Sequence, residues 1–246
     1  MSMSKKLFII AAVIIVVVAI SGGFYWFKQD NSDTVDDAVI LSQPIIKWQE
    51  ITVAEFKPKI AMRINAPRII IHSNYRVDNE VNRAIQQHIE SIKDYFINVT
   101  TMVAEDNDET NILNIETEVL LVTPRLISLA FTSTERFAGI NNRETERTFM
   151  VFDLVNNKIM IEGGELFPDA LSWSRAVTIM KKNLLSDYKG DPSCDLSFAP
   201  KHNGFAASCI GVDWSRGGKH LSVMGNISMS VLQEFLTPSV LSDMMQ

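Results

Sequence analysis

The sequence contains few of the residues and motifs from which enzyme active sites are usually built. Only four histidines and two cysteines occur among 246 residues. None of them falls into an HExxH, an HxH or a close Cys/His pattern that would predict a zinc site. The GxSxG, P-loop and GxGxxG motifs are also absent. The sequence therefore predicts no catalytic residue, no metal site and no cofactor.

Two glutamate pairs have the spacing of neighbouring positions on one face of a strand. Glu116 and Glu118 form one pair, and Glu144 and Glu146 form the other. Paired carboxylates can cleave glycosidic bonds, but regular alternation along a solvated strand explains both pairs better. The acidic segment 104–110 lacks the glycine and the ligand spacing of a calcium-binding helix-loop-helix, so we expect it to be a solvated loop.

Basic clusters are equally scarce. The chain has 23 lysines and arginines against 29 aspartates and glutamates, a net charge of −6. The adjacent lysine pairs are Lys5-Lys6 and Lys181-Lys182. Phosphate backbones are bound by a basic stripe, so nucleic acid is not an expected partner.

One stretch, residues 7–27, carries no charge at all and is long enough to cross a hydrocarbon layer of about 30 Å. Lys5-Lys6 precede it, and an aromatic group begins at Phe24. A cleaved signal peptide ending near Ser21 is the alternative to a transmembrane anchor. We favour the anchor because the apolar run continues to the aromatic residues. The basic flank then places residues 1–6 in the cytoplasm, with an acidic linker (28–43) and an extracytoplasmic domain (44–246) outside the cell membrane.

The two cysteines, Cys194 and Cys209, both lie in this exported part. In an oxidising compartment they predict a disulfide, worth about 3 kcal/mol in the chain-entropy model. Two buried thiols are the alternative. We favour the disulfide because the segment between them resembles a loop that a covalent link would stabilise.

Residues 126–167 predict three successive antiparallel strands. Ile127, Leu129 and Phe131 alternate with small or polar residues, the period of a half-buried strand. Asn156-Asn157 predicts a tight turn, because asparagine tolerates a positive φ. Elsewhere, alternation predicts strands in 47–71, 111–123, 205–213 and 219–224, and helices are expected at 78–103, 169–188 and 230–235. The order β-β-α-β-β-β-β-α-β-β-α indicates an α+β protein with a largely antiparallel sheet, packed helices and one preceding transmembrane helix.

Several segments resemble those of a known family, in order and spacing. They are Ala66-Pro67-Arg68, Val81-Asn82, the strand from Ile127 to Phe131, and Phe152-Asp153-Leu154 followed by Glu165-Leu166-Phe167. Together they are similar to the extracytoplasmic sensor domain of the RsiV-like anti-sigma factors, which also precedes the catalytic domain of some peptidoglycan deacetylases. The resemblance spans most of residues 48–237 and implies an envelope sensor or binding domain.

The chain departs from that family at two loops. The family's Gly-Gly-Ala-His is replaced by the segment 137–142, and the stretch 212–218 is shorter and keeps one aromatic residue. If these loops contact the ligand, the ligand of this chain differs. Residues 1–6 are too few to grip a sigma factor, so we expect no anti-sigma activity. The metal-binding His-x-x-x-His of the deacetylases is absent, so we expect no deacetylase activity.

The strongest candidate for a binding surface is the tip of the predicted hairpin. It combines polar and basic side chains with one aromatic residue: Arg136, Phe137, Asn141, Asn142 and Arg143. We expect a membrane-anchored binding or sensor module for a cell-wall glycan (peptidoglycan) or a lysozyme-like protein. A hydrolase acting on the envelope is the alternative, and a cleft with converging histidine and carboxylate groups would favour it. A structural role in an envelope complex would require a large exposed apolar patch.

Overall fold

The computed structural model describes residues 43–56, 59–71, 75–103, 109–139, 143–160, 164–186, 188, 193–213 and 219–245. The chain divides into two units, 1–38 and 39–246, and every described residue belongs to the second. The anchor expected at residues 7–27 and nearly all of the expected linker lie outside the described residues. Within the described residues, no helix combines the length and the apolar character needed to span a membrane.

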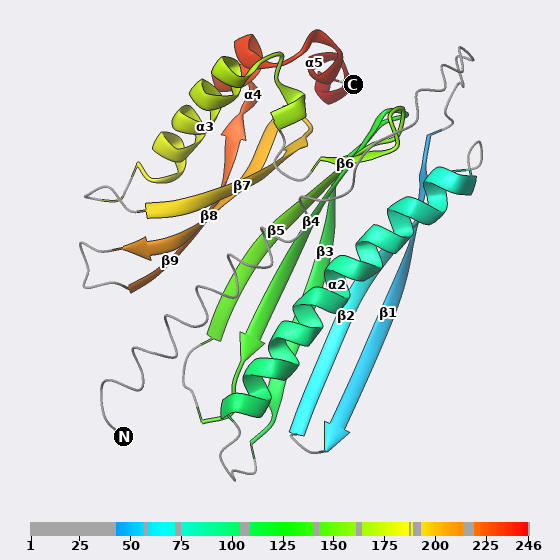
Figure 1. Cartoon of the computed structure of the whole chain (residues 1–246), viewed down its shortest axis with the longest axis vertical. Coiled ribbons are helices and arrows are strands. Elements are labelled where there is room, and N and C mark those ends of the chain that lie inside the picture. Colours follow the sequence, from blue (N-terminus) through cyan, green and yellow to red (C-terminus); the bar gives the residue numbers. More distant parts are fainter. Residues whose placement is uncertain are drawn as a thin grey trace. The chain divides into compact units, whose positions relative to one another are not determined.

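A six-stranded sheet forms the first half of the fold, with its strands in sequence order (Figure 1). Neighbouring strands are antiparallel except β2 and β3, which are parallel because the helix α2 crosses between them. The largely antiparallel α+β fold expected from the sequence is thus confirmed. The strands are β1 (Ile45–Phe56), β2 (Lys59–Ile70), β3 (Asn111–Val122), β4 (Leu126–Arg136), β5 (Arg143–Asp153) and β6 (Lys158–Met160).

The three-strand meander predicted at residues 126–167 is formed by β4, β5 and β6. Asn157 has a φ of +48°, as the predicted turn requires. The Asp153 carboxylate stabilises this turn by accepting hydrogen bonds of 3.0 Å from the backbone N–H groups of Val155 and Asn156.

Helix α2 (Tyr75–Val103) covers one face of this sheet (Figure 1). Its apolar stripe, which includes Val81, Ile89 and Phe96, packs on strand residues such as Ile64 and Phe131. A polar contact fixes the start of the helix, because the Asn82 side chain bonds both the N–H and the C=O of Ile69 at 2.8 and 2.7 Å. We call the opposite face of the sheet its outer face.

A second, three-stranded sheet follows, so the fold contains two sheets where the sequence predicted one. It consists of β7 (Ser193–Lys201), β8 (Gly204–Asp213) and β9 (Lys219–Ser228). The loop predicted after Cys194 was wrong, because residues 193–201 form the strand β7. The turn between β7 and β8 contains Asn203 with a φ of +59°. The remaining elements are η1 (Gly164–Leu166), α3 (Ala170–Leu184), α4 (Met229–Leu232), η3 (Gln233–Phe235) and α5 (Pro238–Met245).

The two sheets share a hydrophobic core at one end of the outer face. Leu126, Ala130 and Val151 from the first sheet belong to the same buried cluster as Phe198 and Phe205 from the second. Two hydrogen bonds tie the second sheet to β5. The hydroxyl of Ser208 donates to Arg147 O at 2.8 Å, and that of Ser222 donates to Thr145 O at 3.2 Å.

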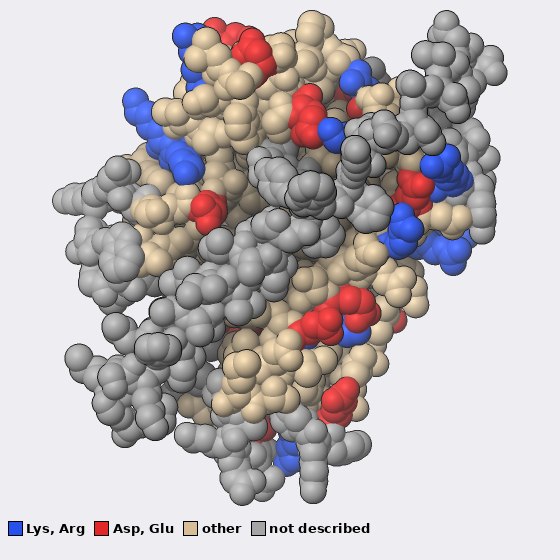
Figure 2. All heavy atoms as spheres, in the orientation of Figure 1, with Lys and Arg blue, Asp and Glu red and all other residues tan. Residues whose placement is uncertain are grey.

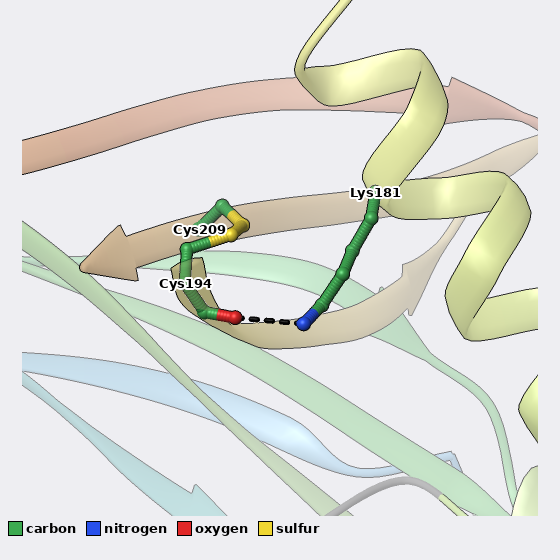
Figure 3. Close-up of a disulfide and its surroundings, with 3 residues drawn as sticks. All are labelled: Lys181, Cys194 and Cys209. Atoms are coloured by element: carbon green, nitrogen blue, oxygen red, sulfur yellow. Dashed lines mark hydrogen bonds between the residues drawn. A yellow bond between two sulfur atoms is a disulfide. The ribbon is translucent and has the colours of Figure 1, made fainter. Parts of the chain in front are cut away.

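The predicted disulfide is present and links β7 to β8 (Figure 3). Cys194 and Cys209 are both buried, and their Cα atoms lie 5.5 Å apart. Lys181 of α3 reaches the same point, because its Nζ donates a hydrogen bond of 2.7 Å to Cys194 O (Figure 3). The disulfide therefore joins two strands of one hairpin at the place where α3 is also held.

Candidate functional site

The hairpin of β4 and β5 separates its charges between the two faces of the sheet. Residues directly opposite one another point to the same side, and successive residues point to opposite sides. Arg136 lies opposite Arg143, and Glu135 lies opposite Glu144. The arginine positions therefore belong to the outer face and the glutamates to the face that α2 covers.

A depression of about 350 Å³ lies on the outer face, at the end of β3 and β4. It is lined by Ile112 and Asn114 from β3 and by Thr134 and Arg136 from β4. Arg136 lies opposite Ile112, and Thr134 lies opposite Asn114. The lining thus offers a guanidinium, an amide, a hydroxyl and one aliphatic side chain. These groups suit a polar ligand that carries a carboxylate.

Two ion pairs flank the depression on the outer face. The Arg63 Nε lies 2.8 Å from a Glu50 carboxylate oxygen, and Arg147 pairs with Glu118. Arg136 is exposed, and the described part of the chain supplies it with no ion-pair partner. Position 143 lies opposite it in the hairpin.

The structure places the five residues expected at the hairpin tip in different environments or does not describe them. Arg136 lines the depression, and Arg143 begins β5 opposite it. Asn141 and Asn142 lie outside the described residues. Phe137 was expected to be a surface aromatic, but its side chain is only 7 % exposed and stacks on Phe96 with ring centroids 5.3 Å apart. It therefore belongs to the core and cannot contact a ligand at the surface.

Glu135, Glu144, Glu146 and Tyr95 influence one another electrostatically on the α2 side of the hairpin, a grouping that the sequence did not predict. Glu135 is only 6 % exposed. Burial, followed by the negative charges of Glu146 and Glu144, raises the pKa of its carboxyl to about 7. Burial, together with the same three glutamates, raises the pKa of Tyr95 to about 12. Glu144 and Glu146 were expected on a solvated face, yet they lie close enough to Glu135 to influence its ionisation.

The charges of α2 itself are more dispersed. Among the described residues on the α2 side, Figure 2 shows acidic and basic side chains in small separate groups. Exposed pairs such as Arg76–Glu80 and Lys93–Glu90 neutralise one another along the helix. Such surface pairs contribute little stability. The described residues of this side form no broad basic stripe of the kind that binds nucleic acid.

His88 is a packed residue of α2. Its Nε2 lies 2.8 Å from the Thr148 hydroxyl, and its ring meets that of Phe131 at 4.7 Å between centroids. Burial lowers its pKa, so the imidazole is neutral at physiological pH. Within the residues that the structure describes, no group of three or more potential ligands is placed to hold a metal ion.

Comparison with solved structures shows a shared fold. A member of the DUF3298 family from Bacteroides fragilis NCTC 9343 matches with a TM-score of 0.50 and 15 % identity, over 83 % of this chain and 97 % of that one. A DUF3298 family protein from Pseudomonas aeruginosa PAO1 matches with a TM-score of 0.45 and 13 % identity, over the same shares of the two chains. No family model and no curated protein sequence matches the chain. The first likeness shows that the chain shares the fold of a DUF3298 protein.

Proposed function

We propose that the chain is an RsiV-like extracytoplasmic binding or sensor module, and that its ligand contacts the depression around Arg136. The lining of that depression carries the proposal, because it combines an exposed guanidinium with an amide and a hydroxyl on adjacent strands. Resemblance of the sequence to the RsiV-like sensor domains supports the module type. The fold shared with a DUF3298 protein is consistent with it.

The chemistry of the depression favours one of the two expected ligands. A guanidinium binds a carboxylate through two parallel hydrogen bonds, while Asn114 and Thr134 can bond hydroxyl and amide groups. Ile112 supplies an apolar contact of the kind that a sugar ring or a methyl group fills. A cell-wall glycan with carboxylate groups therefore matches the depression better than a lysozyme-like protein does.

The hydrolase alternative ranks second because its requirements are not met together. Glu135 has a pKa of about 7, which suits a general acid. Its side chain, however, is 6 % exposed and lies on the α2 side of the sheet, away from the depression. Among the described residues, the four that line the depression include neither a histidine nor a carboxylate.

Calorimetric titration of the full chain in detergent, with soluble peptidoglycan fragments and with lysozyme, tests the binding proposal. Arg136→Ala should weaken binding of the fragments about 10- to 100-fold, the range expected when a charged hydrogen-bond partner is lost. Arg83→Ala is the matched control, because Arg83 is exposed on α2, on the other side of the sheet. Equal affinity of the two variants would refute the assignment of the depression as the binding site. If neither the fragments nor lysozyme gave heat of binding, both would be excluded as ligands.

We also infer that residues 7–27 anchor the chain in the cell membrane and leave residues 44–246 outside. The apolar run without charge and the preceding Lys5-Lys6 support this. The chain should stay in the pellet when membranes are washed with alkaline carbonate, and protease added to intact spheroplasts should digest the domain. Release into the supernatant would contradict the anchor.

A further inference from the structure

The first strand, β1, forms one edge of the six-stranded sheet. It is 12 residues long and pairs with β2 without any shift of register, from Ile45 to Phe56. Natural edge strands are usually short, carry charged side chains, or are interrupted by proline or a bulge, since their unpaired N–H and C=O groups can bind another strand. β1 contains no proline and no such bulge, and its charged residues are Lys47, Glu50 and Glu55. It therefore presents a long, regular edge.

Side chains along this edge are also unusually exposed. Trp48 is 50 % exposed and Ile45 is 44 % exposed, although both are large and apolar. Most of the other residues of the strand are exposed as well, and Ile46, Ile51 and Val53 are half-buried. Trp48 is the large apolar side chain that cross-strand neighbours of a pairing strand would partly cover.

We propose that β1 pairs antiparallel with β1 of a second copy of this chain, about a two-fold axis at Ile51. Such an axis requires a strand that is complementary to itself. With the axis at Ile51, Lys47 lies opposite the partner's Glu55, and Glu55 lies opposite the partner's Lys47. Trp48 lies opposite the small Ala54 of the partner subunit. The two six-stranded sheets then join into one continuous sheet.

The neighbouring registers fit less well. An axis at Glu50 brings the two Glu50 carboxylates directly against each other, and like charges at opposite positions are destabilising. An axis at Thr52 places Glu55 opposite the partner's Gln49 and Glu50 opposite the partner's Ala54, so neither charged pair forms. Among these three registers, only the one centred on Ile51 forms the Lys47–Glu55 ion pair, and it forms that pair twice. This repeated complementarity favours a second copy over an unrelated extended peptide as the partner of the edge.

Cysteine crosslinking of the full chain in native membranes tests this register. Ile51→Cys should form a disulfide-linked dimer, because opposite residues of an antiparallel pair have Cα atoms about 4.5–5.5 Å apart, within the range of a disulfide. Val53→Cys is the matched control: the residue is half-buried on the same strand, but its two copies would lie about 13 Å apart. Equal crosslinking at both positions, or none at position 51, would overturn the proposal.

A charge swap gives an independent measurement that does not depend on a new cysteine. Sedimentation equilibrium of the full chain in detergent should show a dimer whose dissociation constant rises about tenfold or more for Lys47→Glu and for Glu55→Lys. Each single variant places like charges opposite each other twice, and the double variant K47E/E55K should restore the dimer. A monomer at every concentration, or a dimer whose dissociation constant is unchanged in all three variants, would overturn the pairing. Neither result would affect the binding proposal for Arg136, because the depression lies on β3 and β4.

Discussion

The buried carboxyl of Glu135 should make the stability of the domain depend on pH near neutrality. It is 6 % exposed on β4, beneath the C-terminal half of α2, and Glu144 lies directly opposite it. Among the described residues, the titratable groups that interact with it electrostatically come from two elements, Glu144 and Glu146 from β5 and the phenol of Tyr95 from α2. None of these three groups is a cation. Replacement by the isosteric Gln should therefore remove a destabilising ionisation and little else.

The direction and the size of this change in stability follow from the change in the pKa of Glu135. Folding raises the pKa of Glu135 from 4.5 to about 7, so the folded chain holds a proton that the unfolded chain releases. The free energy of unfolding should fall as the pH rises from about 4.5 to about 7, and it should then stay level. The total loss is about 3 kcal/mol, since one pKa unit corresponds to about 1.36 kcal/mol. Glu135→Gln should recover most of it at pH 8 and almost none at pH 4.5.

Thermal unfolding followed by circular dichroism at pH 4.5 and pH 8 measures this difference. For a domain of this size, about 3 kcal/mol corresponds to a rise in Tm of roughly 6–12 °C. Glu116→Gln is the control, because Glu116 is exposed on the outer face of β3. The reasoning is refuted if Glu135→Gln gives the same Tm difference from the wild type at both pH values. It is refuted equally if Glu116→Gln reproduces the effect.

Three other pairs of substitutions test the packing around the hairpin and the second sheet. Phe137→Ala should lower the free energy of unfolding by about 3–5 kcal/mol in urea titrations, whereas Arg136→Ala should change it by less than about 0.5 kcal/mol; equal losses would contradict the burial of Phe137. Cys194→Ala with Cys209→Ala should cost about 3 kcal/mol, and reduction of the wild type by dithiothreitol under unfolding conditions should reproduce that loss. Gly211→Ala should cost about 1–3 kcal/mol, because an added Cβ would lie 2.6 Å from Cys194 Cα, while Gly164→Ala should be nearly neutral because its Cβ would meet nothing within 4 Å.

The sequence contained enough information to place the elements whose determinants are local. The stripe of Val81, Ile85 and Ile89 defined α2, and the alternation of apolar residues defined β4. Asn157 marked the turn between β5 and β6 because that position requires a positive φ. Strand β7 was missed although Asn203-Gly204 is a strong hairpin signal. Its Pro200 and its serines obscured the apolar alternation of Leu196 and Phe198.

The side-chain environments at the hairpin tip depended on a long-range contact and were predicted less well. Phe131, Ser133, Glu135 and Phe137 share the α2 face, so the two-residue period continues beyond the end of β4. From the local pattern alone, a glutamate in that series indicates a solvent-exposed position. Glu135 and Phe137 are buried because α2 continues past Phe96 and covers that end of the sheet. The same coverage explains why Glu135 and Phe137 are buried while Arg136, between them, is exposed.

The position of the depression follows from how the two cores share β4. Its first six residues, from Leu126 to Phe131, are buried on both faces, because α2 covers one side and the second sheet covers the other. Beyond Phe131 the outer face is half-buried at Thr132 and Thr134 and exposed at Arg136. A ligand at Arg136 would thus meet an open surface on a strand whose other half is fixed in two cores. Rigid strands hold polar groups in place more accurately than loops do, so this end of β4 combines access with a fixed geometry.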